Sequence, residues 1–264
     1  SIALGAASDS FWLGGSMNGK VVVVTGASAG IGAAVAGRVS ERGASVVLVS
    51  RSKQALEAVS DTCQGETLVA VADVTKREEV KEVVDTTLRA FGRIDVWINN
   101  VGRGITRQPS ELTATDLDLI MQTNVHSAVF GMQEVLPHFR ERGVGHVINI
   151  SSLLGRVPFV TFRSAYCGAK HFLNALTETF RSEVQDTHPD IQFSLVSPGV
   201  VRTNFGLNSL HGGPDSKEFP GAQDPEEVAE VIVSVIDSRR PDVYTFEGAR
   251  DRVRSYYAGL GIDP

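Results

Sequence analysis

The chain has 264 residues, 42% of them hydrophobic and 21% charged, and its formal net charge is -6. This composition is typical of a soluble globular protein and gives no basic surface for nucleic acid, so no nucleic-acid partner is expected. No apolar run approaches the ~20 residues of a membrane-spanning helix, and the two cysteines form neither a disulfide framework nor a zinc-binding pattern. We therefore expect a cytoplasmic protein in a reducing compartment, without a metal site or a membrane partner.

The first sixteen residues, SIALGAASDSFWLGGS, precede Met17 and end in a linker-like Gly-Gly-Ser. They lack the basic start and the long apolar stretch of a secretory signal. We expect residues 1–16 to be vector-derived or to form a disordered N-terminal arm. Residues 17–264 have the length of one large domain and are expected to form a single domain.

Short runs rich in β-branched residues recur along the chain, with helical patterning between them. The runs cover residues 21–24, 45–49, 67–71, 96–98, 146–150, 193–196 and 243–246. Capping-box spacing at Thr75, Thr113 and Asp224 marks the start of three helices. Continuous apolar strands are typical of a parallel sheet covered on both faces. The pattern predicts a single-domain, doubly wound α/β fold with a seven-stranded, mostly parallel sheet and helices on both faces.

The first predicted strand leads directly into TGASAGIG, which places Gly26, Gly30 and Gly32 at the turn into the next helix. Glycines at such a turn let the backbone approach a pyrophosphate, which the free amides and positive dipole end of the helix then hold. The G-x-x-x-G-x-G spacing is not that of a P-loop, so nucleotide hydrolysis is disfavoured. We predict a Rossmann-type dinucleotide-binding turn, to which Ser28 and Ile31 also belong.

The ends of the next strands indicate which dinucleotide binds. A fold that prefers NAD places a carboxylate about 20 residues beyond the glycines, whereas an arginine accommodates the 2′-phosphate of NADP. Ser50 and Arg51 end the second strand, which predicts NADP(H) over NAD(H); a solvated arginine is the alternative. Asp73, Val74 and Asn99 follow the third and fourth strands, and we expect them along the adenine and ribose path unless they are ordinary turn formers.

The stretch SAYCGAKHF sets Tyr166 and Lys170 one turn apart on a predicted helix, so both side chains lie on nearly the same face. The apolar arc of this helix predicts that the pair lies at a boundary between core and solvent. The ordinary interpretation is a partly exposed aromatic ring beside a snorkelling lysine. The chemical interpretation is a tyrosine hydroxyl whose pKa is brought towards neutrality by the nearby ammonium and by a positive nicotinamide.

Residues 204–223 are too rich in glycine, proline and serine for a regular element. Hinge-like glycines and apolar side chains predict a substrate lid that is mobile when empty, with a disordered surface loop as the alternative. Apolar side chains in the segments expected to wall the pocket favour an apolar substrate, namely those of Leu153, Leu154, Phe159, Phe162, Phe205, Leu207, Leu210 and Phe219. Four arginines keep an acidic group on the substrate open, at positions 103, 107, 156 and 163.

The glycine turn, NNVG, ISSLLG, YCGAK and SPGVVRT occur in this order between residues 19 and about 250. Through them the chain resembles the short-chain dehydrogenase/reductase family in its roughly 250-residue form. The resemblance implies that Tyr166 is the catalytic acid/base, that Lys170 supports it and contacts a ribose, and that Ser152 donates to the substrate carbonyl. Further residues that it implies at the cofactor are Asn99, Val101, Gly102, Pro198, Gly199, Val200 and Thr203.

Asn124 is the fourth member of the catalytic tetrad by this resemblance, through a water relay to Lys170. A buried amide that bonds backbone groups is the other interpretation. The chain departs from the family at Val101, which replaces an alanine, and in the fourteen residues from Ser152 to Tyr166, which leave Ser151 or Ser152 as the donor. The C-terminal sequence lacks the Asp-Gly-Gly strand that often joins tetramers, and we expect either a homodimer or a homotetramer.

The resemblance implies an oxidoreductase that transfers a hydride between NADP(H) and a carbonyl or secondary alcohol of a small molecule. One rival is a catalytically silent scaffold that senses the dinucleotide, which a broken tetrad would indicate; here the tetrad is intact. A second rival is an epimerase or dehydratase of the extended branch, which has a different glycine pattern and a longer C-terminal domain.

Overall fold

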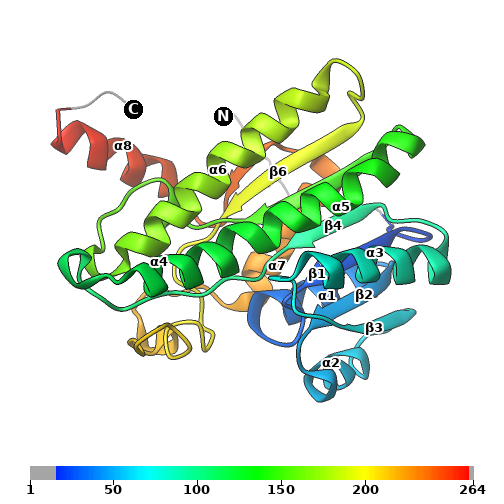
Figure 1. Cartoon of the computed structure of the whole chain (residues 1–264), viewed down its shortest axis with the longest axis horizontal. Coiled ribbons are helices and arrows are strands. Elements are labelled where there is room, and N and C mark those ends of the chain that lie inside the picture. The colour runs from blue at the N-terminus through cyan, green and yellow to red at the C-terminus, as the bar shows by residue number, and fades with distance from the viewer. Residues whose placement is uncertain (1–15, 262–264) are drawn as a thin grey trace, which may run out of the picture.

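The computed structural model describes residues 16–261, so an arm at residues 1–15 lies outside the described residues. Strands and helices alternate along this range (Figure 1). The strands are β1 Val21–Thr25, β2 Ser45–Ser50, β3 Thr67–Val71, β4 Val96–Asn99, β5 Gly145–Ile150, β6 Ile191–Ser197 and β7 Asp242–Tyr244. The α-helices are α1 Gly30–Glu41, α2 Lys53–Ser60, α3 Arg77–Phe91, α4 Ala114–Met121, α5 Ser127–Arg142, α6 Ser164–Gln185, α7 Pro225–Ser238 and α8 Ala249–Gly259.

The seven strands form one sheet in the order β3-β2-β1-β4-β5-β6-β7. Every pair of neighbouring strands is parallel, so the sheet is wholly rather than mostly parallel. The chain order reverses between β1 and β4, and the two halves wind outward from that point. Ligands of such folds bind outside the carboxyl ends of the strands at this switch point. The predicted doubly wound fold is confirmed.

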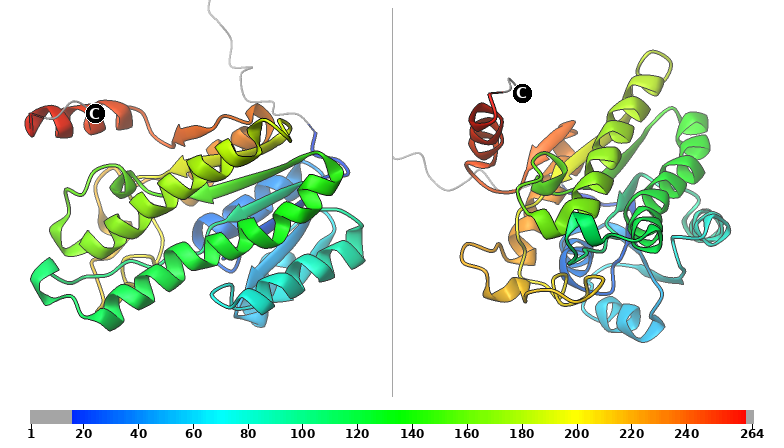
Figure 2. Two further views of the ribbon diagram at one scale, coloured as in Figure 1. Left: turned by 45° about the horizontal axis from the view of Figure 1, so that its top comes forward. Right: turned by 60° about the vertical axis from the view of Figure 1, so that its left-hand side comes forward.

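Helices cover both faces of the sheet, as the views in Figures 1 and 2 agree. Alternate residues of β1 enter different cores: Val22 and Val24 pack with α1 and α7, whereas Val21 and Val23 pack with the layer of α3 and α5. The strand reads as an unbroken run of valines because it has no solvent-facing side. This double burial fixes the strands and hence the sites of the loops at their ends.

Two expectations about element ends are corrected. Thr75 does not cap α3, which starts after Lys76 without a capping side chain; its hydroxyl instead donates to Asp73 Oδ1 at 2.7 Å within the preceding turn. The last strand ends at Tyr244 rather than at 246, and the chain then forms α8. In both views of Figure 2, α8 extends from the body of the domain beyond β7. The capping boxes at Thr113 and Asp224 are present.

Candidate active site

The glycine turn lies between the end of β1 and the start of α1, and the chain packs too tightly there for side chains. Gly26 has a φ of 68°, in the left-handed region that favours glycine. A Cβ on Gly32 would lie 2.3 Å from the Gly26 carbonyl oxygen. No side chain caps the first turn of α1, whose N-cap residue is Ala29. The turn therefore fits a dinucleotide pyrophosphate, because its amides and helix dipole have no internal anion to satisfy them.

The side chain that braces this turn belongs to Asn100, which the sequence reasoning missed. Its Nδ2 donates to the carbonyl oxygens of Thr25 at 3.1 Å and Gly26 at 3.3 Å. Asn99 is 5% exposed and points into the core, where it accepts from Trp97 Nε1 at 2.7 Å and donates to Asn149 Oδ1 at 2.8 Å. Successive side chains of a strand point to opposite faces, so the side chain of Asn99 serves the fold, which corrects the expectation for that side chain.

The residues expected near the adenine end meet at the neighbouring ends of β2 and β3. Ser50 is half-buried, and the guanidinium of Arg51 is exposed with no side-chain hydrogen bond or ion pair within residues 16–261. Burial opposes ionisation of Asp73, but hydrogen bonds from Thr75 and the charge of Arg51 outweigh it, so the pKa of Asp73 lies below its usual value. Val74 is buried. Arg51 is thus an unpaired cation at the expected position of the 2′ group.

Tyr166 and Lys170 are both buried, with 6% and 3% of their surfaces exposed, rather than at a boundary. The ordinary interpretation of a snorkelling lysine therefore fails. Lys170 Nζ donates to the Ile150 carbonyl at the end of β5, 2.8 Å away, and lies 5.7 Å from the centre of the Tyr166 ring. A Cβ on Gly102 would lie 3.1 Å from Asn124 Oδ1 and 3.5 Å from Lys170 Nζ, so the loop after β4 passes between these two side chains.

Burial dominates the ionisation of this pair in the protein without bound ligands. It raises the pKa of Tyr166 to about 12, although a hydrogen bond with Ser152 opposes the shift. It lowers the pKa of Lys170 to about 7. The expected depression of the tyrosine pKa is thus absent in this state, because desolvation disfavours the charged form of both groups. A positive charge next to the Tyr166 hydroxyl would lower its pKa again.

The two candidate serines at the end of β5 have different environments. Ser151 Oγ donates to Asn174 Oδ1 at 2.5 Å and faces α6. Ser152 Oγ accepts from Leu154 N at 3.1 Å and lies beside the Tyr166 hydroxyl, whose pKa it lowers. The structure therefore brings Ser152, and not Ser151, to Tyr166.

Asn124 lies in a π-helical turn, Gln122–His126, between α4 and α5, and is fully buried. Its Oδ1 accepts from Arg103 N at 3.0 Å, and its Nδ2 donates to the carbonyls of Arg103 and Ile120, both at 2.9 Å. The side chain thus bonds backbone groups, as the second interpretation held, and it fixes the loop that follows β4. Single π-helical turns of this kind occur frequently at functional sites.

The segment after β6 contacts both the glycine turn and the turn after β5 that contains Ser152. The carbonyl of Pro198 accepts from Leu153 N at 2.8 Å, and a Cβ on Gly199 would lie 2.9 Å from the ring of Phe246. A Cβ on Gly30 would lie 2.9 Å from Thr203 Cγ2. Val200 is exposed. On the opposite side, Val101 Cγ2 lies 3.2 Å from a Cβ placed on Gly26, so the valine lies directly against the turn.

Residues 205–211 of the predicted lid segment pack beside Tyr166 and the loop after β4. Phe205 packs edge-on against the Tyr166 ring, with 5.5 Å between ring centroids. Leu210 pairs with the loop after β4 through backbone bonds from Leu210 N to Gly104 O at 2.9 Å and from Thr106 N to Leu210 O at 3.0 Å. His211 Nε2 lies 2.7 Å from Asp116 Oδ1. The first part of the segment therefore packs against the tyrosine and the loop after β4.

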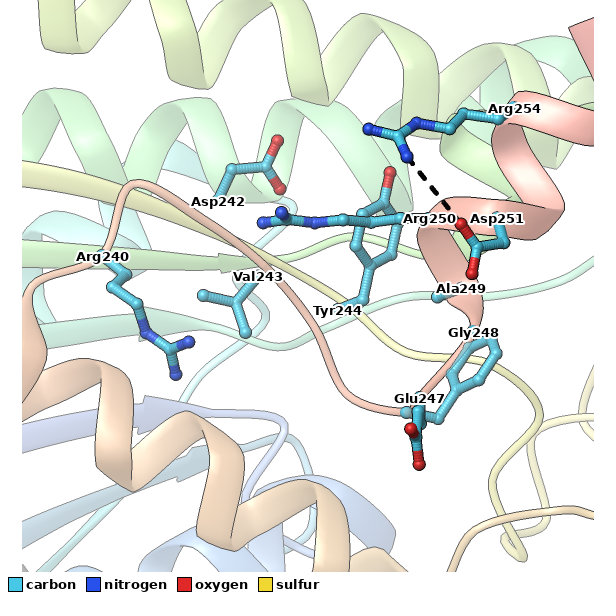
Figure 3. Close-up of a pocket in the computed structure, with 11 residues that line it drawn as sticks. Arg240, Asp242, Val243, Tyr244, Glu247, Gly248, Ala249, Arg250, Asp251 and Arg254 are labelled. Carbon is cyan, nitrogen blue, oxygen red and sulfur yellow. Dashed lines mark ion pairs between the residues drawn. The ribbon is translucent and has the colours of Figure 1, made fainter.

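A pocket of ≈ 440 Å³ lies elsewhere, between β7 and α8. Figure 3 shows its charged side chains, including Arg240, Asp242, Arg250 and Arg254, and Tyr166 and Lys170 do not line it. Within residues 16–261, no group of His, Cys, Asp and Glu side chains has the arrangement of a metal site. None of the helices in that range is both long and apolar enough to cross a membrane.

The parallel sheet, its switch point and the uncapped glycine turn define a dinucleotide-binding α/β protein. A family model described as short chain dehydrogenase matches residues 20–211, and the chain belongs to this family. It is 32% identical over 235 residues to the uncharacterized oxidoreductase YxnA of Bacillus subtilis; the alignment covers 85% of this chain but only 65% of that protein. The resemblance inferred from the sequence is confirmed.

Solved structures with the same fold contain both nicotinamide dinucleotides. An alcohol dehydrogenase of Thermococcus sibiricus complexed with 5-hydroxy-NADP is 29% identical, with a TM-score of 0.74, and 85% of this chain and 95% of that one align. A short-chain dehydrogenase/reductase of Burkholderia phymatum in complex with NAD has a TM-score of 0.82 at 23% identity, covering 94% and 96% of the two chains. The family implies a nicotinamide dinucleotide, and the choice between the two depends on this chain's own residues.

Proposed function

We propose that the protein is an NADP(H)-dependent oxidoreductase that interconverts a carbonyl and a secondary alcohol on a small molecule. The observation that carries the proposal is the convergence of Ser152 and Lys170 on Tyr166 next to the glycine turn. The dinucleotide, when bound, supplies or accepts the hydride. The chain's own residues must then bind it, orient the substrate oxygen and move one proton.

The proton is assigned to the Tyr166 hydroxyl, because Ser152 lies beside it and Lys170, one turn further along α6, has its Nζ 5.7 Å from the centre of the tyrosine ring. In the reductive direction, Tyr166 donates its proton to the carbonyl oxygen while Ser152 donates a hydrogen bond to the same oxygen. Lys170 stabilises the phenolate that forms. Asn124 positions the loop after β4 through its hydrogen bonds to the Arg103 backbone. A water relay from Asn124 to Lys170 is also part of the proposal.

The rival is a catalytically silent scaffold that only senses the dinucleotide. A broken catalytic tetrad would indicate such a scaffold, whereas Tyr166 and Ser152 lie next to each other here. A panel of ketones, aldehydes and secondary alcohols, run with NADPH and NADH or their oxidised forms and read by absorbance of the reduced nicotinamide, tests the proposal. Turnover that requires Tyr166 supports it. Dinucleotide binding without turnover across a chemically broad panel favours the scaffold.

NADPH is expected to bind at least ~10-fold more tightly than NADH, because a phosphate paired with the free guanidinium of Arg51 forms charge-assisted hydrogen bonds. Ser50→Asp should erase or reverse the preference by placing a carboxylate beside the 2′ position. Fluorescence titration of both dinucleotides measures this. Ser52→Asp, two residues further on at the N-cap of α2, is the matched control for added charge. Equal affinities in the unaltered protein contradict the assignment.

Residues 204–223 are proposed to act as a substrate lid, and the same packing supports an apolar pocket. Phe205, Leu210 and Leu154 pack around Tyr166, whereas Leu153 is buried against α8 and cannot wall the pocket. Because the lid packs against Tyr166, it must lift to admit substrate. Assembly as a homodimer or homotetramer, and a cytoplasmic location, remain part of the proposal.

Hydrogen exchange is expected to show intermediate protection in residues 204–213 of the free protein and more protection with NADPH and a substrate-like inhibitor together. In the free protein, the backbone hydrogen bonds of Thr106 and Leu210 slow the exchange of these amides. Closure over a ligand is expected to slow it further. Amides of residues 135–142 in α5, whose buried side chains pack in a different core cluster from Phe205 and Leu210, serve as the internal reference. Unchanged exchange in the free, binary and ternary states contradicts the lid.

A further inference from the structure

The four arginines near the site differ in what they bind. Arg156 is paired with Asp242, and Arg107 is paired with Asp116 at 2.7 Å. Arg103 is exposed, and its Nε donates to the Asn208 carbonyl at 3.0 Å. Arg163 is 8% exposed, and within residues 16–261 no carboxylate lies within ion-pair distance of it. Of the four, only Arg163 is both buried and without an anionic partner in the described structure.

The position of Arg163 brings its guanidinium close to the reacting group. Arg163 is the N-cap residue of α6, and Tyr166 follows three residues later, less than one helical turn along the chain. The charge of Arg163 is near enough to act on the pKa of Tyr166, which it lowers. A Cβ on Gly104 would lie 2.3 Å from Arg163 Nη1, so the loop after β4 has glycine where the guanidinium passes.

The hydrogen bonds of Arg163 are those of a cation held by neutral groups. Its Nη1 donates to Ser209 Oγ at 2.5 Å and to the Ile105 carbonyl at 3.2 Å. Burial lowers its pKa, and only Tyr166 and Cys167 oppose the shift. A buried charge is costly unless an opposite charge pairs with it. An anion that enters the site would therefore offset the free-energy cost of burying the Arg163 charge.

A second polar atom at the same place lacks a partner. Thr106 Oγ1 is buried and makes no hydrogen bond within the described structure. A Cβ placed on Gly213 would lie 3.0 Å from this oxygen and 3.1 Å from Arg163 Nη2. The hydroxyl and the guanidinium therefore face one small region beneath the lid segment. Two hydrogen-bond donors of this kind match the two oxygens of a carboxylate.

We propose that Arg163 binds an acidic group of the substrate, with Thr106 as a second donor, so that the preferred substrates are oxo or hydroxy acids with an apolar remainder. This inference rests on the proposed function and names its substrate class. A carboxylate displaces the neutral Ser209 hydroxyl from Arg163, because it compensates the buried positive charge, which a hydroxyl does not, and can accept two hydrogen bonds from the planar guanidinium. Ser209 belongs to residues 204–223, so acid binding and lifting of that segment are the same event.

Turnover of matched acids and esters tests the specificity. The probes are 2-oxo-4-phenylbutanoate, 4-oxo-4-phenylbutanoate and 5-oxo-5-phenylpentanoate, each compared with its methyl ester under NADPH. For at least one chain length, kcat/KM of the acid is expected to exceed that of the ester by ~30-fold or more in the unaltered protein. Arg163→Gln should bring the ratio to within ~3-fold of one, mainly through KM of the acid. Arg103→Gln removes an exposed arginine that also bonds the lid segment, and it should retain the ratio.

Binding without chemistry separates this inference from the proposed function. Calorimetry with the NADPH complex compares 4-phenylbutanoate with 4-phenylbutanamide, and only the unaltered and Arg103→Gln proteins should prefer the acid. Equal binding of acid and amide by the unaltered protein overturns the inference, even if ketones are reduced. A loss in Arg163→Gln that is equal for acids and esters, with a shifted pH profile for both, also overturns it, because Arg163 then acts through Tyr166. Acid-selective binding without any turnover supports the inference and contradicts the proposed function.

Discussion

Tyr166→Phe is expected to lower kcat by at least ~100-fold while NADPH still binds. The substitution removes the hydroxyl to which the proton transfer is assigned, and it keeps the ring that packs against Phe205 with 5.5 Å between ring centroids. The buried hydroxyl has its pKa raised to about 12, so phenylalanine is not expected to destabilise the site. Steady-state kinetics on any substrate from the carbonyl panel, with fluorescence titration of NADPH, gives both quantities.

Tyr256→Phe is the matched control, since it deletes a half-buried tyrosine hydroxyl on α8 and should leave kcat within ~2-fold. Near-normal turnover of Tyr166→Phe would refute the acid/base assignment and leave the scaffold as the better account. Loss of NADPH binding in the same variant would mean that the hydroxyl, and not the backbone turn at Gly26, holds the dinucleotide.

Lys170→Met is expected to reduce both turnover and dinucleotide affinity, each by at least ~10-fold, because one ammonium has two assigned roles. Methionine keeps most of the apolar stem in a site where 3% of the lysine is exposed. Kinetics and NADPH titration are compared with those of Lys53→Met, which removes an exposed ammonium in α2. Loss of only one of the two functions would separate the roles.

The same variant should also change how stability depends on pH in the protein without dinucleotide. Burial lowers the pKa of Lys170 from 10.5 to about 7. Between these values the unfolded chain retains the proton and the folded chain has lost it, so the free energy of unfolding rises with pH by up to about 1.4 kcal/mol per unit. Urea unfolding from pH 7 to 9.5 should show a smaller slope in Lys170→Met than in Lys53→Met. Equal slopes would place the Lys170 pKa near its ordinary value.

The sheet can be predicted from residue types alone, because a strand buried on both faces must be apolar at every position and β-branched residues favour it. The dinucleotide turn can be predicted in the same way. Only glycine has the backbone freedom needed at Gly26 and the absence of a Cβ needed at Gly32, so the turn is recorded in residue types at fixed spacing. The four-residue step from Tyr166 to Lys170 fixed their shared face, since helical geometry is local.

Which of two adjacent residues faces the site can be read only from the folded chain. Asn100 rather than Asn99 braces the turn, and Ser152 rather than Ser151 reaches Tyr166, because side-chain direction depends on where the strand ends in the assembled sheet. Burial and, through it, the pKa directions at Tyr166 and Lys170 likewise depend on the folded chain.

Arg163 shows why the remaining features are hidden in the sequence. Its partners, Ser209 and the Ile105 carbonyl, are 46 and 58 residues away. A guanidinium is an ordinary surface group by residue type, and it becomes a candidate recognition element only when packing removes it from water without supplying a carboxylate. Local patterns thus determined the elements and the turn. Desolvation and partner choice required the folded chain, because both are set by residues far apart in sequence.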